Sequence, residues 1–561
     1  MGISALDWVI LLSTLLFIVS YGVWKTRFAV SGTDFVSGGN EARWFTVGLS
    51  VMATQASAIT FLSTPGQAFH DGMGFVQFYF GLPLAMVVIC MFFLPTLKKS
   101  KVLTAYEYLE NRFDNKTRLF TAILFLIQRG LGAGLTIYAP SIILSTIFGW
   151  DLNLLNIMIG VLVTIYTVTG GTKAVNVTHK QQMFVIMAGM AFTFFTILNM
   201  LPDHINLPEA IQIAAASGKM EIVDFTFNTD LKYTFWSGIT GGFFLSLAYF
   251  GTDQSQVQRY LSAESEEQSR IGLIMNGLLK IPLQFFILLC GVLVFVFFQF
   301  NQSPIFFNPS VMEKLEQSSE KDKIFQLESD YVEVFNARQM LIADPSMDIK
   351  SVESELATLN AQERKLRSEV KEVINKALPG EESNDKDYVF ISFILNFLPT
   401  GLIGLLLAVI FSAAMSSTAS ELNALSTTTT IDIYKRNIKP DLDEKGFVKS
   451  TKLFTLLWGA IAISFACYGT LFENLIQFVN IVGSIFYGTI LGIFLVGFFF
   501  KQVKANAVFY SAVITQVMII VIYKADVIGY LWLNAIGSLG VVILSIIANL
   551  FISSKTDFSN D

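Results

Sequence analysis

The sequence predicts an all-α membrane protein with about 13 transmembrane helices. Of its 561 residues, 53% are hydrophobic and only 15% are charged, and the mean hydropathy is +0.57. A soluble domain carries about 25% charged residues. The apolar residues also form blocks of roughly 20 residues, the length at which a helix crosses a hydrocarbon core of about 30 Å. Composition and block length together exclude a soluble globular domain.

The predicted spans follow one another along the whole chain. The first is expected to remain in the protein as a helix, because residues 1–24 lack the basic start and the small-residue cleavage site of a signal peptide. The spans cover residues 4–24, 45–70, 75–97, 118–147, 154–170, 181–201, 234–258, 271–300, 401–431, 449–470, 473–500, 507–524 and 529–552.

Basic residues in the loops predict the orientation, since cytoplasmic loops are enriched in Lys and Arg. They follow the first, third, ninth and eleventh spans, and all of them face the cytoplasm if the N-terminus is outside and the C-terminus is cytoplasmic. The expected location is the plasma membrane, or the inner membrane if the chain is bacterial. The residues are Lys25, Arg27, Arg43, Lys98, Lys99, Lys101, Lys435, Arg436, Lys439, Lys501 and Lys504.

Residues 301–387 interrupt the hydrophobic pattern with a polar segment of mixed charge, which this topology places outside the cytoplasm. Within it, residues 352–378 have helical character, with Glu and Lys at i,i+4 spacing. Two interpretations stay open. The segment is either a helical cap or spacer, or a docking surface for a partner protein.

Three polar stretches interrupt otherwise apolar spans, at residues 50–61, 249–260 and 412–423. Such interruptions are typical of discontinuous membrane helices, whose unwound backbone is free to bind ions or substrate. Packing of small residues between helices is the alternative for each stretch. Asp253 argues against packing alone, because an ionisable group inside a span is a functional hypothesis by default.

Several motifs then identify a resemblance. They are Trp-Phe-Thr-Val-Gly-Leu-Ser at 44–50, Gly-Gly-Thr-Lys-Ala-Val at 170–175, Gln-Ser-Gln-Val-Gln-Arg-Tyr-Leu at 254–261, Ala-Ala-Met-Ser-Ser at 413–417 and Asp-Ile-Tyr-Lys at 432–435. In combination they resemble the sodium/solute symporter family, which includes sodium/glucose, sialic acid, proline, iodide, monocarboxylate and multivitamin carriers. The 254–261 motif looks most like the iodide, monocarboxylate and multivitamin branch.

The resemblance implies a LeuT-like fold of two inverted five-helix repeats, each opened by a broken helix. The first repeat would cover 45–201, and the second would cover 234–500 with the 301–387 insert inside it. Residues 1–30 would add one transmembrane helix before the repeats, and 505–552 would add two after them.

The resemblance also implies the binding residues. The sodium site would use the carbonyls of Ala53, Ala56 and Ala413 and the hydroxyls of Ser416 and Ser417. The substrate pocket would be lined by Gln55, Ile59, Thr60, Asp253, Gln254, Lys280, Gln477 and Asn480. Positions 55, 59 and 60 differ from the Asn, Glu and Gln of the sugar carriers, so the galactose-type pocket is not reproduced.

A second departure concerns the coupling ions. Where many members carry Trp-Thr-Asp, this chain has Val-Thr-His ending at His179, and Lys180 follows. Of two hydroxyls that would complete a second sodium site, one position is Ala419 and only Ser420 remains. The sequence therefore predicts that a second sodium site is absent. His179 and Lys180 are either the edge of a basic loop, or Lys180 reaches inward and protons drive coupling.

Two basic residues lie inside predicted spans. Arg129 either pairs with Asp253 or Glu421, or clamps a substrate carboxylate, whose geometry a guanidinium matches. Lys280 has the same two interpretations. Together they favour the hypothesis of an anionic or acidic-sugar substrate.

The function predicted from the sequence is sodium-coupled import of a small organic solute (a sugar, an acidic sugar or a monocarboxylate) by alternating access. Na⁺ is the expected coupling ion, with no other cofactor and no nucleic-acid partner. The alternatives are a proton-coupled carrier of the same fold, and a transporter-like sensor or scaffold. No enzymatic activity is expected, since no nucleophile–base pair or metal-ligand spacing is present.

Overall fold

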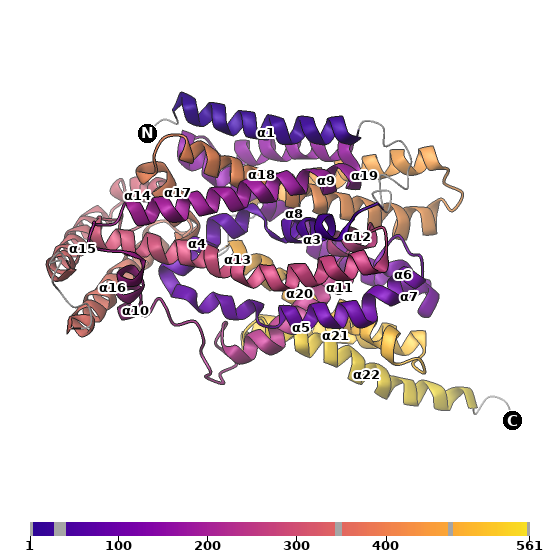
Figure 1. Cartoon of the computed structure of the whole chain (residues 1–561). Coiled ribbons are helices and arrows are strands. Elements are labelled where there is room, and N and C mark those ends of the chain that lie inside the picture. The colour runs from indigo at the N-terminus through magenta and orange to yellow at the C-terminus, as the bar shows by residue number, and fades with distance from the viewer. Residues whose placement is uncertain (1–3, 27–40, 343–350, 469–474, 558–561) are drawn as a thin grey trace.

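The computed structural model describes residues 4–26, 41–342, 351–468 and 475–557. Within these ranges the chain forms helices and two isolated β-bridges, with no strand. Figure 1 shows long helices lying side by side, with α14 (Pro309–Glu316), α15 (Lys321–Ile342) and α16 (Glu353–Ala377) gathered at one end of the bundle. The all-α prediction is confirmed.

Every predicted span falls on helical segments. The helices of the first half of the chain are α1 (Ala5–Thr26), α3 (Trp44–Gln55), α4 (Ala58–Asp71), η2 (Gly72–Tyr79), α5 (Leu82–Val88), η3 (Ile89–Phe93), α6 (Leu94–Lys99), α7 (Ala105–Arg112), α8 (Asn115–Phe148), α9 (Leu152–Asn199) and α10 (Leu207–Ala216). In the second half they are η4 (Ser237–Gly241), α11 (Gly242–Thr252), α12 (Gln254–Leu261), α13 (Glu266–Phe300), α17 (Lys386–Phe397), α18 (Leu402–Thr428), η6 (Thr429–Ile438), α19 (Glu444–Tyr468), α20 (Leu475–Phe499), α21 (Ala505–Ala525) and α22 (Trp532–Asp557).

The helix α9 differs from the prediction, because it joins the expected spans 154–170 and 181–201 without an interruption. A straight helix of 48 residues would be about 72 Å long, well beyond the thickness of a bilayer. Its two halves nevertheless have different partners. Asn156 donates a hydrogen bond to the carbonyl of Ala466 in α19, 3.0 Å away, whereas Gly189 packs against Val409 of α18. The halves thus keep the separate surroundings of two spans.

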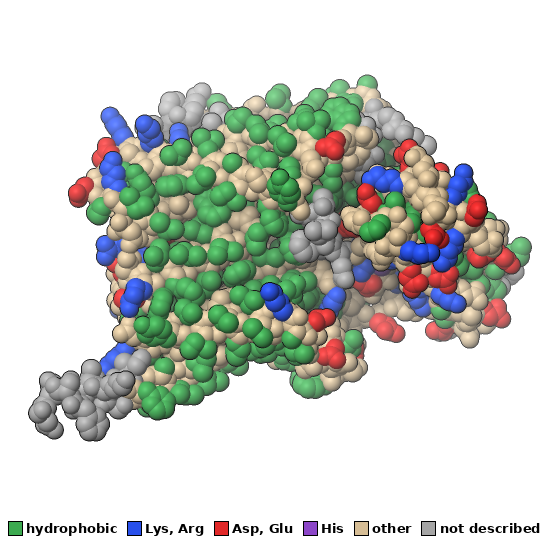
Figure 2. All heavy atoms as spheres, turned by 180° about the vertical axis from the view of Figure 1, so that it is seen from behind, with side chains coloured by type: hydrophobic (Ala, Val, Ile, Leu, Met, Phe, Trp, Pro, Cys, Tyr) green, Lys and Arg blue, Asp and Glu red, His purple; other side chains and the backbone are tan. Residues whose placement is uncertain are grey.

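The membrane-facing surface is a broad apolar belt. Figure 2 shows hydrophobic side chains covering the body of the molecule, while Lys, Arg, Asp and Glu gather on the α14–α16 end and along the opposite edge. Among the described residues, nine helices are long and apolar enough to cross a membrane, and 5–18 and 152–165 are shorter apolar helices. Large side chains such as Phe184 are 75% exposed, which is favourable only against lipid. The protein is therefore a multi-pass membrane protein.

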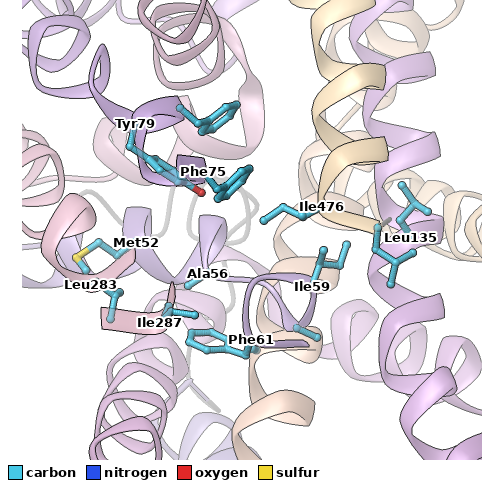
Figure 3. Packing of buried hydrophobic residues seen from close by; sticks show 14 of the residues in the cluster. Met52, Ala56, Ile59, Phe61, Phe75, Tyr79, Leu135, Leu283, Ile287 and Ile476 are labelled. Carbon is cyan, nitrogen blue, oxygen red and sulfur yellow. The ribbon is translucent and has the colours of Figure 1, made fainter. Parts of the chain in front are cut away.

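The bundle is packed closely around α4. A Cβ atom added to Gly291 of α13 would lie 2.2 Å from the carbonyl oxygen of Pro65, and one added to Gly66 would lie 1.8 Å from that of Lys386 in α17. Small residues at these points let the helix backbones approach each other. Figure 3 shows buried apolar side chains from several helices meeting at this centre, among them Phe61 of α4.

The insert between α13 and α17 has its own small hydrophobic core. The predicted helix at 352–378 is confirmed as α16, and a buried charge network joins it to α15. Glu363 accepts hydrogen bonds from Arg367, at 2.9 Å, and from Arg338. We call these three residues the insert trio. Burial alone would raise the pKa of Glu363, but the charges of Arg367 and Arg338 outweigh it and hold that pKa at about 2.

The insert is attached to the end of α4. The Arg367 guanidinium lies 5.8 Å from the ring centre of Phe69, and it donates to the carbonyl of Ile305 at 2.7 Å. At the start of α17, Lys386 forms an ion pair with Asp71 at 2.7 Å. The insert and α4 therefore share charged and aromatic contacts.

Candidate functional site

The first broken helix lies between α3 and α4, where Ala56 leaves helical geometry with φ −80° and ψ 70°. In a continuous helix, the amide of residue i donates to the carbonyl of residue i−4. Here the Ser57 amide donates to Gln55 instead of Ala53, and the Thr60 amide donates to Ser57 instead of Ala56. The break therefore takes the helical donor away from the carbonyls of Ala53 and Ala56, among others of this turn.

A row of hydroxyl groups lies on α18, which packs against both halves of this broken helix. Ser417 donates to the carbonyl of Ala413 at 2.8 Å, and the buried hydroxyl of Ser416 has no hydrogen-bond partner. Ser420 donates to the carbonyl of Ser416 at 2.9 Å and lies 3.5 Å from the hydroxyl of Thr54 in α3. Released carbonyls and a hydroxyl without a partner are the neutral oxygen ligands that a small hard cation prefers.

The predicted interruption at 412–423 is not a break in the backbone, because α18 runs through it. The hydroxyls of Ser417 and Ser420 bond to carbonyls of the preceding turn of the same helix, which satisfies them without unwinding it. The other two interruptions, at 50–61 and 249–260, are confirmed as breaks.

The second break separates α11 from α12 at Asp253, whose backbone is extended. One carboxylate oxygen of Asp253 accepts hydrogen bonds from the amide and the hydroxyl of Ser255, at 2.8 and 2.6 Å. The other accepts from the Tyr487 hydroxyl at 2.6 Å and from Arg129. The carboxylate is thus fixed by its own helix start and by two other helices.

Arg129 of α8 lies between two acids. Its Nε donates to Asp253 at 3.1 Å, and its Nη1 donates to Glu421 at 3.0 Å. Its Nη2 donates to Asp253 and to the Tyr487 hydroxyl. We call Arg129, Asp253 and Glu421 the bundle trio. All three side chains are buried, and the second carboxylate oxygen of Glu421 accepts from Thr136 at 3.1 Å.

Beside the bundle trio is a cavity with about 820 Å³ of empty space, counted out to its opening. It lies where the first break, η2, α8, α11, α18 and α20 converge. The wall includes Thr54, Gln55, Ser57, Ile59, Thr60, Phe78, Tyr79, Gln128, Arg129, Thr136, Ser246, Tyr249, Phe250, Glu421, Ile476, Asn480 and Tyr487.

This arrangement of two broken helices around a midbundle cavity agrees with the sequence comparison. The sequence profile of the sodium:solute symporter family matches residues 35–326 and 368–515, which is most of the chain. The chain belongs to the sodium:solute symporter family. Residues 327–367, which include most of α15 and of α16, lie outside the match, so the family profile does not cover the middle of the insert.

Named members of this symporter family are similar over different lengths. The sodium/iodide cotransporter of Homo sapiens is 31% identical over 48% of this chain, and the match spans only 41% of that protein. The sodium-coupled monocarboxylate transporter 2 of Bos taurus is 28% identical over 87% of this chain and 68% of its own length. The sodium/sialic acid symporter SiaT of Proteus mirabilis (strain HI4320) is 24% identical over 98% of this chain and 96% of its own.

Solved structures confirm the LeuT-like fold. A Na⁺-coupled sialic acid symporter, in a substrate-bound outward-open state, superposes with a TM-score of 0.76 at 23% identity and covers 98% of both chains. Mhp1, a nucleobase-cation-symport-1 family transporter in a closed conformation with bromovinylhydantoin bound, gives a TM-score of 0.51 at 9% identity, covering 93% of this chain and 95% of its own.

The structure brings part of the predicted substrate set together. Gln55, Ile59, Thr60, Arg129 and Asn480 line the cavity, and Asp253 lies behind Arg129. Other predicted residues lie outside the wall: Gln254, Lys280 and Gln477.

Two of these exceptions have a physical reason. The amide of Gln254 is used by the loop before α7, because it accepts from the Ala105 amide at 3.0 Å and donates to the Leu103 carbonyl at 2.9 Å. Lys280 is buried in α13 with no hydrogen-bond partner, and its ammonium lies 5.5 Å from the ring centre of Tyr79. The Tyr79 ring does line the cavity, so it stands between that charge and the empty space.

The structure places the two neighbouring residues predicted for ion coupling, His179 and Lys180, in different surroundings. Lys180 is exposed, whereas His179 is buried and its Nδ1 lies 2.8 Å from the Ser50 hydroxyl in α3. Nearby, the fully buried Arg259 donates to Asn176 at 3.3 Å, but its Nη2 has no partner and no acidic side chain of the described chain pairs with it. Lys180 therefore lies at an exposed position within the continuous helix α9 and not at the edge of a loop.

The sequence interpretation missed much of the cavity wall. Tyr79, Tyr487 and Gln128 were not predicted, and Glu421 was considered only as a partner of Arg129. The available signal was weak, because an aromatic residue in an apolar span looks like ordinary core. Gln128 alone carried a signal, since an amide next to Arg129 inside a membrane span is uncommon.

Proposed function

We propose that the chain is a sodium-coupled secondary active symporter that imports a small organic solute (a sugar, an acidic sugar or a monocarboxylate) by alternating access. The observation that carries this proposal is the break at Ala56. The same unwound segment releases the carbonyls of Ala53 and Ala56 and presents Gln55 to the cavity wall. Ion binding at the carbonyls would order the segment that contacts the solute, which couples the two binding events.

For sodium, we propose the carbonyls of Ala53, Ala56 and Ala413 with the hydroxyls of Ser416 and Ser417. Support comes from the lost helical donors at 53 and 56 and from the hydroxyl of Ser416, which has no partner. These oxygens are neutral, so they hold a monovalent cation without the strong attraction of a carboxylate. Release of the ion on the far side requires such moderate binding.

For topology, we propose repeats at 45–201 and 234–500, with an extra helix in 1–30 and two more in 505–552. The N-terminus and the insert would be outside, and the C-terminus would be cytoplasmic, in the plasma membrane or in the inner membrane of a bacterium. The insert would act as an external cap or would contact an external partner. We assign no enzymatic activity.

The sodium proposal is tested by thermal unfolding of the purified protein in sodium and in choline. A ligand that binds only the folded state adds about 2.7 kcal/mol at a 100-fold excess over its dissociation constant. We expect a sodium-specific stabilisation that Ser417→Ala removes. Ser426→Ala is the matched control, because it deletes an equally buried hydroxyl from the same helix.

The outcomes are distinct. Equal sodium responses in the wild type, Ser417→Ala and Ser426→Ala would contradict the proposed ligands. A protein indifferent to sodium but stabilised in a pH-dependent way would contradict sodium coupling and favour protons.

A further inference from the structure

The hydrogen-bond donors of Arg129 that matter for carboxylate recognition are already in use. A guanidinium binds a carboxylate through two neighbouring N–H groups that form a fork. In Arg129 the fork of Nε and Nη2 faces Asp253, and Nη1 faces Glu421. A solute carboxylate would have to displace one of these acids or lie beside it, and like charges in one buried site are unfavourable.

The cavity wall offers no second cation. Arg129 is the only Lys or Arg on the described wall, and Glu421 adds a carboxylate to it. Lys280 lies outside the wall, with its Nζ 5.5 Å from the ring centre of Tyr79. An anionic solute would therefore meet one committed guanidinium and one carboxylate on the wall.

What the wall does offer is neutral polar groups and aromatic faces. Gln55, Gln128 and Asn480 place neutral amide residues in the lining of the cavity. A few polar groups of this kind in an otherwise apolar wall orient an uncharged solute through hydrogen bonds. Five aromatic side chains supply apolar area for the carbon–hydrogen faces of a ring-shaped solute: Phe78, Tyr79, Tyr249, Phe250 and Tyr487.

From these contacts we infer that the cavity takes an uncharged, sugar-like solute that its neutral polar and aromatic wall can bind, rather than a carboxylate. The inference rests on the proposed function and selects one of its three solute classes. The bundle trio then has a defined role. It presents a surface that repels anions, while its guanidinium stays neutralised in the empty cavity.

The test measures thermal stabilisation of the full-length protein in sodium by pairs of sugars that differ at one carbon. Glucose, galactose and mannose are compared with their uronates, in which a carboxylate replaces the terminal hydroxymethyl group; other uncharged aldoses and cyclitols, lactate and N-acetylneuraminate complete the panel. We expect at least one uncharged member to stabilise the protein. A uronate partner should bind at least about tenfold more weakly, and the two acids should have no effect.

Two results would overturn the inference while leaving sodium coupling intact: tighter binding of an acid than of its uncharged partner, or a sodium response with no response to any uncharged member. Loss of the sodium response itself would instead count against the proposed function.

A variant with both acids neutralised, Asp253→Asn with Glu421→Gln, sharpens the test because it frees the Arg129 fork. We expect this double variant to bind the uronates at least about tenfold more tightly than the wild type does. The control adds Arg129→Gln, which removes the cation and should abolish that gain. If the double variant does not fold, Glu421→Gln alone keeps the Arg129–Asp253 pair and should show a smaller gain. No gain in a folded double variant would contradict the inference.

Discussion

Two buried charge networks in this molecule have opposite composition. In the insert, one carboxylate lies between two guanidiniums, and in the bundle, one guanidinium lies between two carboxylates. The members of the insert trio are Glu363, Arg338 and Arg367, and those of the bundle trio are Arg129, Asp253 and Glu421.

The difference lies in what surrounds them. The remaining donors of Arg367 reach the Ile305 carbonyl and the hydroxyls of Ser303 and Tyr331, so the network is closed by neighbouring protein. The bundle trio instead has Arg129 and Glu421 on the wall of a cavity. A buried ion network is thus no sign of function in itself, and the empty space beside it is what distinguishes a binding site from a structural connection.

The largest effect is expected from Glu363→Gln, which leaves Arg338 and Arg367 without their shared carboxylate. Breaking a buried pair by removing one partner costs about 3–5 kcal/mol. Hydrogen exchange should therefore accelerate in α15 and α16, while the sodium response of the bundle persists. Glu369→Gln is the control, because its 3.9 Å contact with Lys365 is exposed and is worth at most about 1 kcal/mol. Equal hydrogen exchange in Glu363→Gln and Glu369→Gln would contradict the structural role of Glu363.

Acid should open the insert by the same route. The folded pKa of Glu363 is held at about 2 by Arg367 and Arg338 against the effect of burial, below its ordinary value of 4.5. A depressed pKa contributes stability that is complete above about pH 4.5 and is lost as the pH falls toward 2, which amounts to about 3 kcal/mol. Hydrogen exchange of α16 measured from pH 5 to pH 2 should show this loss. In Glu363→Gln the hydrogen exchange of α16 should not change over this pH range. The same pH dependence in that variant would show that another group causes the loss of stability.

A further guanidinium, that of Arg259, belongs to neither trio, and no acidic side chain in the part of the chain that the structure describes pairs with it. Because burying an unpaired charge is costly, we expect His179→Asp to stabilise the protein by about 1–2 kcal/mol in thermal unfolding. His179→Asn provides the uncharged control. Equal effects of the two substitutions would show that Arg259 does not respond to a nearby negative charge.

The smallest expected effect comes from Tyr487→Phe, which keeps the ring but removes the hydroxyl between Arg129 and Asp253. Loss of one such hydrogen bond costs about 1 kcal/mol. Thermal unfolding should show that decrease, and solute affinity should change with it because Tyr487 lines the cavity. Tyr510→Phe, at an exposed position, should leave both measurements unchanged. If Tyr510→Phe changed stability and solute affinity as much as Tyr487→Phe does, the effect could not be assigned to the Tyr487 hydroxyl.

The spans and two of the three interruptions could be predicted from the sequence, because bilayer thickness fixes the length of an apolar block and polar residues within a block mark a break. The stretch at 412–423 misled the prediction, since hydroxyls that bond within their own helix have the same composition as a break. The continuity of α9 was also missed. Its middle is polar enough to suggest a loop, but local composition does not show whether the helical hydrogen bonds continue.

The pocket was harder to predict than the fold, because its members meet only in three dimensions. Arg129 and Glu421 are 292 residues apart, and no local pattern connects them. Gln254 follows directly after the second break and was expected in the pocket, yet it bonds to Leu103 and Ala105. At a break in a helix, adjacent residues point in different directions. A residue next to a binding residue in the sequence therefore need not line the pocket.

The attachment of the insert to α4 has a mechanical consequence. Lys386 pairs with Asp71, and Gly66 lets the backbone of α17 come close to α4 at the same end. A tilt of α4 during a transport cycle would carry the insert along as a lever. On α15 the Met340 side chain is 81% exposed and is not part of the cavity wall. A spin label or fluorophore at that position would report the opening and closing of the pathway without touching either the ion or the solute.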